Sequence, residues 1–231
     1  MTRYLWAPYR EEAVPVNAFA LEHPAGVVLF DTGQTSRVTQ RGYLPIWHPF
    51  FRLSRFELGE QDEMASQLTT LGIAPADVRW IVLSHLHTDH VGGLPALAGP
   101  EVLVSRVEWE RASGLRGRLR GYLPQHWPTG VVPTLLDLNR GRFGPFPGSH
   151  DVTGDGSVVI VATPGHTPGH VGLLVLRREG AVLLSGDLEH VRADARETTA
   201  RVAAYCADEG IAVVSAHEDC SEGLRLGHHT E

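Results

Sequence analysis

The chain has 231 residues, 42% of them hydrophobic, and a formal net charge of −7 at pH 7. This length and apolar content indicate a globular protein with a sizeable core and exclude a disordered chain. The acidic balance argues against a nucleic-acid partner, and the apolar runs fall short of the ~20 residues that cross a bilayer.

Short strands and helices are predicted along the first half of the chain. Residues 16–33 contain two apolar stretches across a Pro-Ala-Gly turn, which predicts a hairpin. Residues 62–72 place apolar side chains at helical spacing and end at a glycine, which predicts a helix. Residues 78–85 read as a buried strand, and residues 101–112 begin as a strand and turn helical.

The second half continues with three predicted strands, one helix and a last strand. In chain order, these elements are expected within residues 157–166, 171–177, 181–187, 194–210 and 211–217. The chain shows no internal repeat of fixed period and no low-complexity tract. Such an alternation predicts one regular framework that longer segments interrupt.

Two irregular segments interrupt this framework, near residues 34–58 and 113–150. We interpret both as insertions over the active-site face of a single domain that spans residues 1–231. The first insertion either lines a binding pocket with its aromatic side chains or packs them against the core. These aromatic residues are Tyr43, Trp47, Phe50 and Phe51.

An arginine-rich stretch overlaps the second insertion. It contains Arg106, Arg111, Arg116, Arg118, Arg120, Arg140 and Arg142 against Glu108, Glu110 and Asp137. One interpretation is a solvated, salt-bridged helix face. The other is a cap that attracts anionic or carbonyl-rich substrates. The sequence leaves both open.

Histidine and aspartate follow four of the predicted strands. The candidate metal ligands are His85, His87, Asp89 and His90 after the first of these strands, then His166, Asp187 and His217 after the other three. Each strand end is a rigid platform, so side chains placed there can converge on one point. This repeated pattern predicts a metal site far more strongly than a single histidine would.

The local spacing supports the same hypothesis. His85 and His87 lie two residues apart, so both can point to one side of an extended segment. Asp89 and His90 begin a predicted helix, and the Val-Gly-Gly sequence after them indicates a sharp turn. Imidazole and carboxylate donors suit zinc, with iron, cobalt and manganese as alternatives.

The sequence HLHTDH, followed by a distant His, Asp and His, resembles the metallo-β-lactamase superfamily. That resemblance implies an α/β (α+β) fold, the αββα sandwich of two mixed β-sheets with outer helices. It also implies a site for two divalent ions: His85, His87 and His166 at the first metal, Asp89, His90 and His217 at the second, and Asp187 bridging them. Asp31 would orient one of the ligand histidines from outside the metal's coordination sphere.

The resemblance further implies hydrolysis by a hydroxide that bridges the two ions, with Asp89 orienting it or moving its proton. Within the superfamily, residues 14–33, 43–53 and 67–94 are most similar to N-acyl homoserine lactonases. We therefore predict a quorum-quenching lactonase with a small lactone or ester as its partner. The alternatives are a carboxylesterase or phosphotriesterase, and a non-catalytic metal-binding sensor or scaffold.

One position departs from the lactonase pattern. Those enzymes usually carry a tyrosine three residues after the bridging aspartate, where this chain has His190. We expect His190 to be catalytic by donating a hydrogen bond to the substrate carbonyl. It is otherwise a polar loop residue, and a hydroxyl then comes from Tyr43, Tyr122 or Tyr205.

Cysteine use and the N-terminal residues bear on the compartment. Cys206 and Cys220 are too sparse for a disulfide framework and fit a reducing environment. The first residues lack the basic and apolar segments of a secretory signal. We therefore expect a cytoplasmic protein without a membrane partner; the sequence leaves homodimer formation open.

Overall fold

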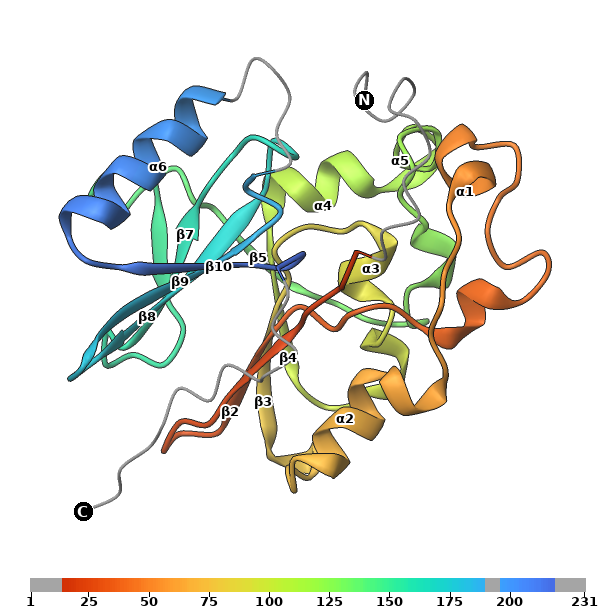
Figure 1. The fold of residues 1–231 in the computed structure, drawn as a ribbon, viewed down its shortest axis with the longest axis horizontal. Coiled ribbons are helices and arrows are strands. Elements are labelled where there is room, and N and C mark those ends of the chain that lie inside the picture. Colours follow the sequence, from red (N-terminus) through yellow and green to blue (C-terminus); the bar gives the residue numbers. More distant parts are fainter. Residues whose placement is uncertain (1–13, 190–195, 219–231) are drawn as a thin grey trace.

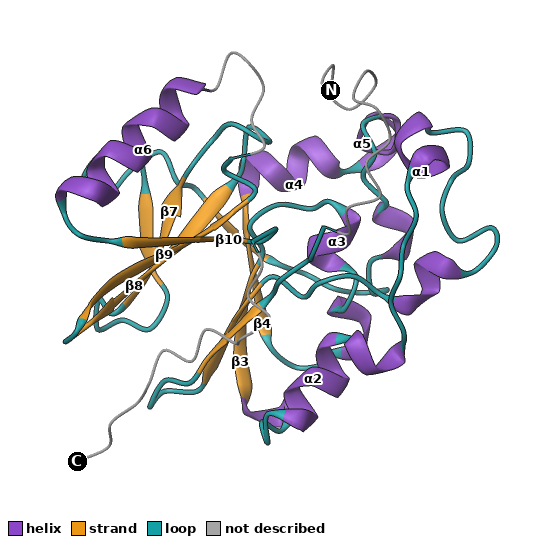
Figure 2. Cartoon of the chain, viewed as in Figure 1, coloured by secondary structure: helices purple, strands orange, loops and turns teal. Residues whose placement is uncertain are grey.

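The protein is described by a computed structural model that covers residues 14–189 and 196–218. Two five-stranded sheets face each other, and helices lie on their outer sides (Figure 1 and Figure 2). This arrangement confirms the predicted αββα sandwich. No helix in the described ranges is long and apolar enough to span a membrane.

The first sheet has the strand order β1-β2-β3-β4-β5. Its strands are β1 (Phe19–Leu21), β2 (Val27–Phe30), β3 (Val78–Val82), β4 (Glu101–Ser105) and β5 (Thr134–Leu136). The predicted hairpin pairs β1 with β2 in antiparallel fashion, and Phe19 lies opposite Phe30. The remaining neighbours are parallel, so the sheet is mixed.

The second sheet has the strand order β10-β9-β8-β7-β6. Its strands are β6 (Ser149–Asp151), β7 (Val158–Ala162), β8 (Val171–Arg177), β9 (Gly180–Gly186) and β10 (Ala212–Ser215). β8 runs antiparallel to both β7 and β9, whereas β10 is parallel to β9. Strands β7, β9 and β10 therefore point the same way, and their carboxyl ends reach one edge of the sheet.

Alternation along the strands explains the layers. Strand β2 is buried on both faces: Val28 and Phe30 contribute to the core between the sheets, and Val27 and Leu29 to the core beneath the helices of the first sheet. Successive side chains of a strand point to opposite faces, so a doubly covered strand needs an unbroken apolar run. The sequence Val-Val-Leu-Phe supplies one.

Within the described residues, six α-helices flank the sheets. They are α1 (Pro49–Leu53), α2 (Met64–Thr70), α3 (Thr88–Val91), α4 (Arg106–Ala112), α5 (Gly114–Leu119) and α6 (Arg196–Asp208). Helix α2 packs Met64 and Leu68 into the core of the first sheet, and α6 packs Val202 and Cys206 against the second. Both pairs lie four residues apart, as one buried helical face requires.

The glycines after His90 have a second role beside the predicted turn. Gly92 and Gly93 form a turn after α3, as predicted, with ordinary negative φ angles of −61° and −81°. A Cβ on Gly92 would lie 2.6 Å from the amide nitrogen of Thr35, and one on Gly93 would lie 2.4 Å from the carbonyl oxygen of Thr32. The glycines therefore let α3 approach the loop after β2.

The two irregular segments contain secondary structure of their own. The first holds a 3-10 helix at Ser36–Thr39 and α1, and the second holds α5 and the edge strands β5 and β6. Phe51 is buried, whereas Trp47 and Phe50 are exposed. The classification of the two segments, near residues 34–58 and 113–150, as insertions into one domain stays a prediction.

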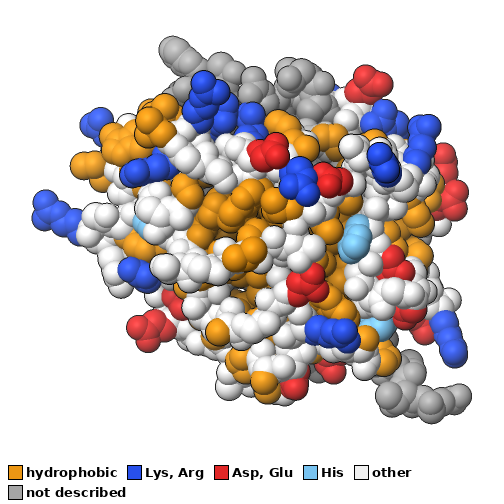
Figure 3. Space-filling view, turned by 180° about the vertical axis from the view of Figure 1, so that it is seen from behind, with side chains coloured by type: hydrophobic (Ala, Val, Ile, Leu, Met, Phe, Trp, Pro, Cys, Tyr) orange, Lys and Arg blue, Asp and Glu red, His pale blue; other side chains and the backbone are white. Residues whose placement is uncertain are grey.

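The arginine-rich stretch lies at the surface. Arg106 Nε and Asp137 Oδ1 are 2.7 Å apart, and both side chains are exposed. This pair fits a solvated, salt-bridged face. The other interpretation, a cap that attracts an anionic substrate, stays a prediction. Figure 3 shows the molecule from behind the view of Figure 1. On this face, arginine and acidic side chains are interspersed around an apolar area.

Candidate metal centre

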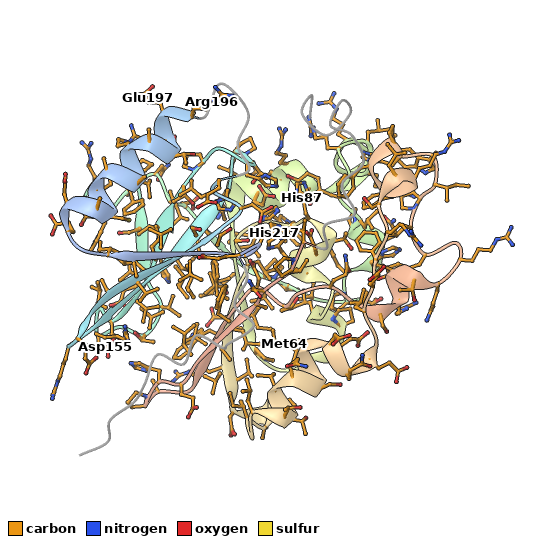
Figure 4. All side chains as sticks on the ribbon, in the orientation of Figure 1. Met64, His87, Asp155, Arg196, Glu197 and His217 are labelled. Carbon is orange, nitrogen blue, oxygen red and sulfur yellow. The ribbon has the colours of Figure 1, made fainter. Side chains whose placement is uncertain are left out.

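The seven predicted metal ligands come together where four strands end. β3 leads to His85 and His87, and the short helix α3 carries Asp89 and His90. The other three, His166, Asp187 and His217, follow β7, β9 and β10. Figure 4 labels His87 and His217 in the central part of the molecule, between the two sheets and the helices of the first sheet.

Three imidazoles form the first group. His85 Nε2 lies 2.9 Å from His87 Nδ1, which is itself 3.0 Å from His166 Nε2. These three ligand atoms lie within 4.8 Å of one another, a separation that one ion can bridge. The structure thus brings together the histidines predicted for the first metal.

A second group, Asp89, His90 and His217, meets the same distance limit. Asp89 Oδ2 is 3.7 Å from His90 Nε2 and 3.9 Å from His217 Nε2. His90 is fully buried, whereas the side chain of Asp89 is 26% exposed. This group therefore combines a sheltered nitrogen donor with a carboxylate that solvent can reach.

Asp187 lies between the two groups. Its Oδ1 is 3.2 Å from His90 Nε2 and 3.2 Å from His217 Nε2. Its Oδ2 is 3.4 Å from His166 Nε2 and 3.9 Å from His85 Nε2. One oxygen faces each group, which is the arrangement expected of a bridging carboxylate.

Hydrogen bonds on the far sides of two rings fix which nitrogens face Asp187. His90 Nδ1 is 2.8 Å from an Asp31 oxygen, and His217 Nδ1 is 2.7 Å from the Pro15 carbonyl oxygen. A carbonyl or carboxylate oxygen only accepts, so each Nδ1 donates and each neutral ring turns the Nε2 lone pair inward.

These inward lone pairs test whether a cation fits. His90 Nε2 and Asp187 Oδ1 are both buried and lack a hydrogen-bond partner although they are 3.2 Å apart. A nitrogen lone pair and a carboxylate oxygen facing each other in a buried site need positive charge between them. The residues present therefore fit a divalent cation.

Electrostatics separates the two groups. Burial, reinforced by the neighbouring His166, lowers the pKa of His87 to about 3. Burial together with three imidazoles holds the pKa of His85 well below its ordinary value. These two rings are neutral near pH 7, as metal ligands must be.

Carboxylates dominate the other half of the site. Burial lowers the pKa of His90, but Asp187, Asp31 and Asp89 outweigh it and hold that pKa well above its ordinary value. Burial raises the pKa of Asp187, yet His90 and His217 reverse the shift and lower it strongly. Without metal this half favours a protonated ring beside an anion, and a bound cation replaces the proton.

Asp31 supports His90 from behind, as the resemblance predicts. It accepts hydrogen bonds from the Ser84 amide and the Ser84 hydroxyl, each at 2.7 Å. It is also the only described non-glycine residue with a positive φ, 62°. Such a backbone is strained and persists when surrounding contacts hold it, here those with Ser84 and His90.

We expect Asp31→Asn to weaken metal binding by about 10- to 100-fold, because an amide replaces the carboxylate that orients His90. Competition with a chromogenic chelator measures this. The matched control is Asp155→Asn, which alters an aspartate 3.0 Å from His23 and far from the site (Figure 4). Equal affinity in both variants contradicts the role given to Asp31.

Three residues of the site were missed from the sequence or left unplaced. His170 Nε2 accepts a hydrogen bond from the Asp187 amide at 3.1 Å, and burial lowers the pKa of His170 to about 3. Tyr122 is buried with its ring 4.9 Å from that of His87. Glu108 is buried beside both histidine loops. Only His170 has a sequence signal, the second Pro-Gly-His of TPGHTPGH.

The predicted substrate-facing donor is not among the described residues. His190 lies outside them, so its role stays a prediction. Of the alternative tyrosines, Tyr43 stacks on His126 and Tyr205 packs beside Phe146. Only Tyr122 among these three contacts a metal-ligand candidate, and it does so through its ring.

Comparison with known families agrees with this geometry. The model of the metallo-β-lactamase superfamily matches residues 12–218. The chain belongs to this superfamily.

Curated relatives of this superfamily member include N-acyl homoserine lactonases. Over 187 residues it is 32% identical to the lactonase AttM of Azorhizobium caulinodans, which covers 75% of this chain and 65% of AttM. Over 183 residues it is 28% identical to a lactonase of Bacillus cereus, covering 78% and 66%. The match thus spans somewhat less than two thirds of those relatives.

Solved structures show the same fold. One is a quorum-quenching N-acyl homoserine lactone lactonase, with a TM-score of 0.72, 23% identity and coverage of 95% of this chain and 86% of the other. Another is an N-acyl homoserine lactone hydrolase holding N-hexanoyl-L-homoserine at its catalytic metal centre, with a TM-score of 0.71, 22% identity and coverage of 95% and 87%. Both likenesses show that the chain has the same fold.

Proposed function

We propose that this protein is a metal-dependent hydrolase that opens lactone rings, with N-acyl homoserine lactones as substrates. The observation that carries the proposal is the placement of Asp187 between two groups of ligand atoms, with the buried His90 Nε2 directed at its Oδ1. The substrate class is supported by the curated relatives, which are named as lactonases of this kind.

The metal assignment follows the two groups. We propose two divalent ions, zinc in the first instance, since nitrogen and carboxylate donors suit it and the described candidate groups contain no cysteine. His85, His87 and His166 would hold one ion, and Asp89, His90 and His217 the other. Asp187 would bridge them.

Bound divalent ions supply Lewis acidity, which polarises a carbonyl oxygen and acidifies water. The protein's own residues do the rest. Asp89 has the more exposed carboxylate, 26% against 7% for Asp187, and is therefore the group proposed to orient the attacking water and accept its proton. His190 is proposed to donate a hydrogen bond to the substrate carbonyl.

The test measures metal content and hydrolysis on the same purified sample. Elemental analysis should find zinc or another first-row metal, and N-acyl homoserine lactones should release acid detectable with a pH dye. If the protein hydrolyses aryl esters or phosphotriesters but leaves the lactones intact, it is a carboxylesterase or phosphotriesterase that uses the same metal site. A loaded sample inert toward all three classes would support the binding scaffold.

A further inference from the structure

Glu108 of helix α4 is a buried carboxylate, only 1% exposed, that the metal site does not use as a ligand. Burying such a group is costly unless hydrogen bonds satisfy its oxygens. Both are satisfied: Oε1 accepts from the Leu86 amide at 3.1 Å, and Oε2 accepts from the Thr167 hydroxyl at 2.6 Å.

The two donors sit beside the first group of metal ligands. Leu86 lies between His85 and His87, and Thr167 directly follows His166. These loops come from β3 in the first sheet and β7 in the second. A single carboxylate therefore ties together the two sheet edges that must meet for three imidazoles to converge.

Close packing reinforces the tie. A Cβ added to Gly169 would lie 2.2 Å from the amide nitrogen of Glu108, so the loop after His166 rests directly on the backbone of α4. On the other side of Glu108, burial and then the charge of Glu108 raise the pKa of Tyr122, whose ring is tilted against that of His87 at a centroid distance of 4.9 Å. Glu108 thus bonds both ligand loops and lies near a tyrosine that packs against one of the ligands.

We propose that Glu108 is a positioning residue that sets the separation of the His85–His87 loop and the His166 loop, and thereby the metal affinity of the first group. Ligand distances in a metal site must hold to within about 0.2 Å, so a small drift between the loops weakens binding. Glu108 is not among the candidate ligands of either group. The proposal rests on the proposed metal site but not on the lactone as substrate.

The experiment compares unfolding by urea in chelator with unfolding at a fixed, buffered free zinc concentration. The gain in stability from zinc reports affinity through linkage, and a tenfold loss of affinity removes about 1.4 kcal/mol of it. We expect Glu108→Ala and Thr167→Val to lose part of this gain, with affinity about 10- to 100-fold lower for Glu108→Ala. Glu108→Gln, which can still bond both loops, should lose less.

Thr134→Val is the matched control, because Thr134 donates to Glu101 at 2.7 Å in a similar threonine–glutamate pair outside the metal site. It should keep the whole zinc-dependent gain. If Thr167→Val and Glu108→Gln keep it too, Glu108 is only structural and the proposal is overturned, even where Glu108→Ala fails to fold. If the unchanged protein gains nothing from zinc, the metal site itself fails.

Discussion

Removing divalent ions with a chelator is expected to lower hydrolysis of the substrate by about a thousandfold or more. Lewis acidity contributes several kcal/mol to such reactions, and about 4 kcal/mol corresponds to a factor of a thousand. Without cations, the five imidazoles and two carboxylates of the two groups provide no Lewis acid to polarise the substrate carbonyl or to acidify the attacking water. Initial rates before and after dialysis against chelator measure the effect.

Restoration distinguishes loss of metal from loss of fold. Adding back zinc, cobalt or manganese to the dialysed protein should recover the rate, and the recovered fraction should follow metal content. Full activity in protein shown to be metal-free by elemental analysis contradicts the catalytic role of the site. The β-strand content measured by circular dichroism should be unchanged in chelator, because the apolar clusters that hold the sheets contain none of the ligands.

The metal ligands were predictable because each follows an apolar strand. Val82, Ala162, Gly186 and Ser215 end four strands whose apolar runs can be recognised in the sequence, and a candidate ligand follows each within four residues. Rigid parallel strands then carry these side chains to a common edge. Local patterns therefore determined both the framework and the seven candidate ligands.

The supporting residues were not predictable in the same way. Glu108 lies 22 residues from Leu86 and 59 from Thr167, and its bonds cross from one sheet edge to the other. In sequence it is one acidic residue among the arginines of a helix. Its burial depends on how α4 packs against two loops, which no local pattern encodes.

The glycines after His90 show a further limit. The sequence predicts a turn there, and the structure has one. A turn and a close tertiary approach select the same residue, so the second reason is hidden in the sequence. Thr32 and Thr35 crowd Gly92 and Gly93 from a loop that is some sixty positions earlier, which only the structure reveals.

Replacing Asp187 by asparagine is expected to reduce activity by about a thousandfold, or about 4 kcal/mol in transition-state free energy. Asparagine has nearly the same size, so packing is preserved. Whichever way the amide turns, its NH2 group meets the inward nitrogens of either His90 and His217 or His85 and His166. One of the two groups thus loses its oxygen, and the bridging negative charge is lost.

The Asp187→Asn variant is tested by measuring its metal content together with its rate of hydrolysis. A bridging aspartate binds both ions, so Asp187→Asn should bind less than the full complement at a free zinc level that saturates the unchanged protein. Asp137→Asn, which alters an exposed aspartate paired with Arg106, should leave content and rate unchanged. Full metal content together with full activity in Asp187→Asn contradicts the bridging role. The negative charge of the carboxylate would then be needed neither to bind the ions nor to support hydrolysis.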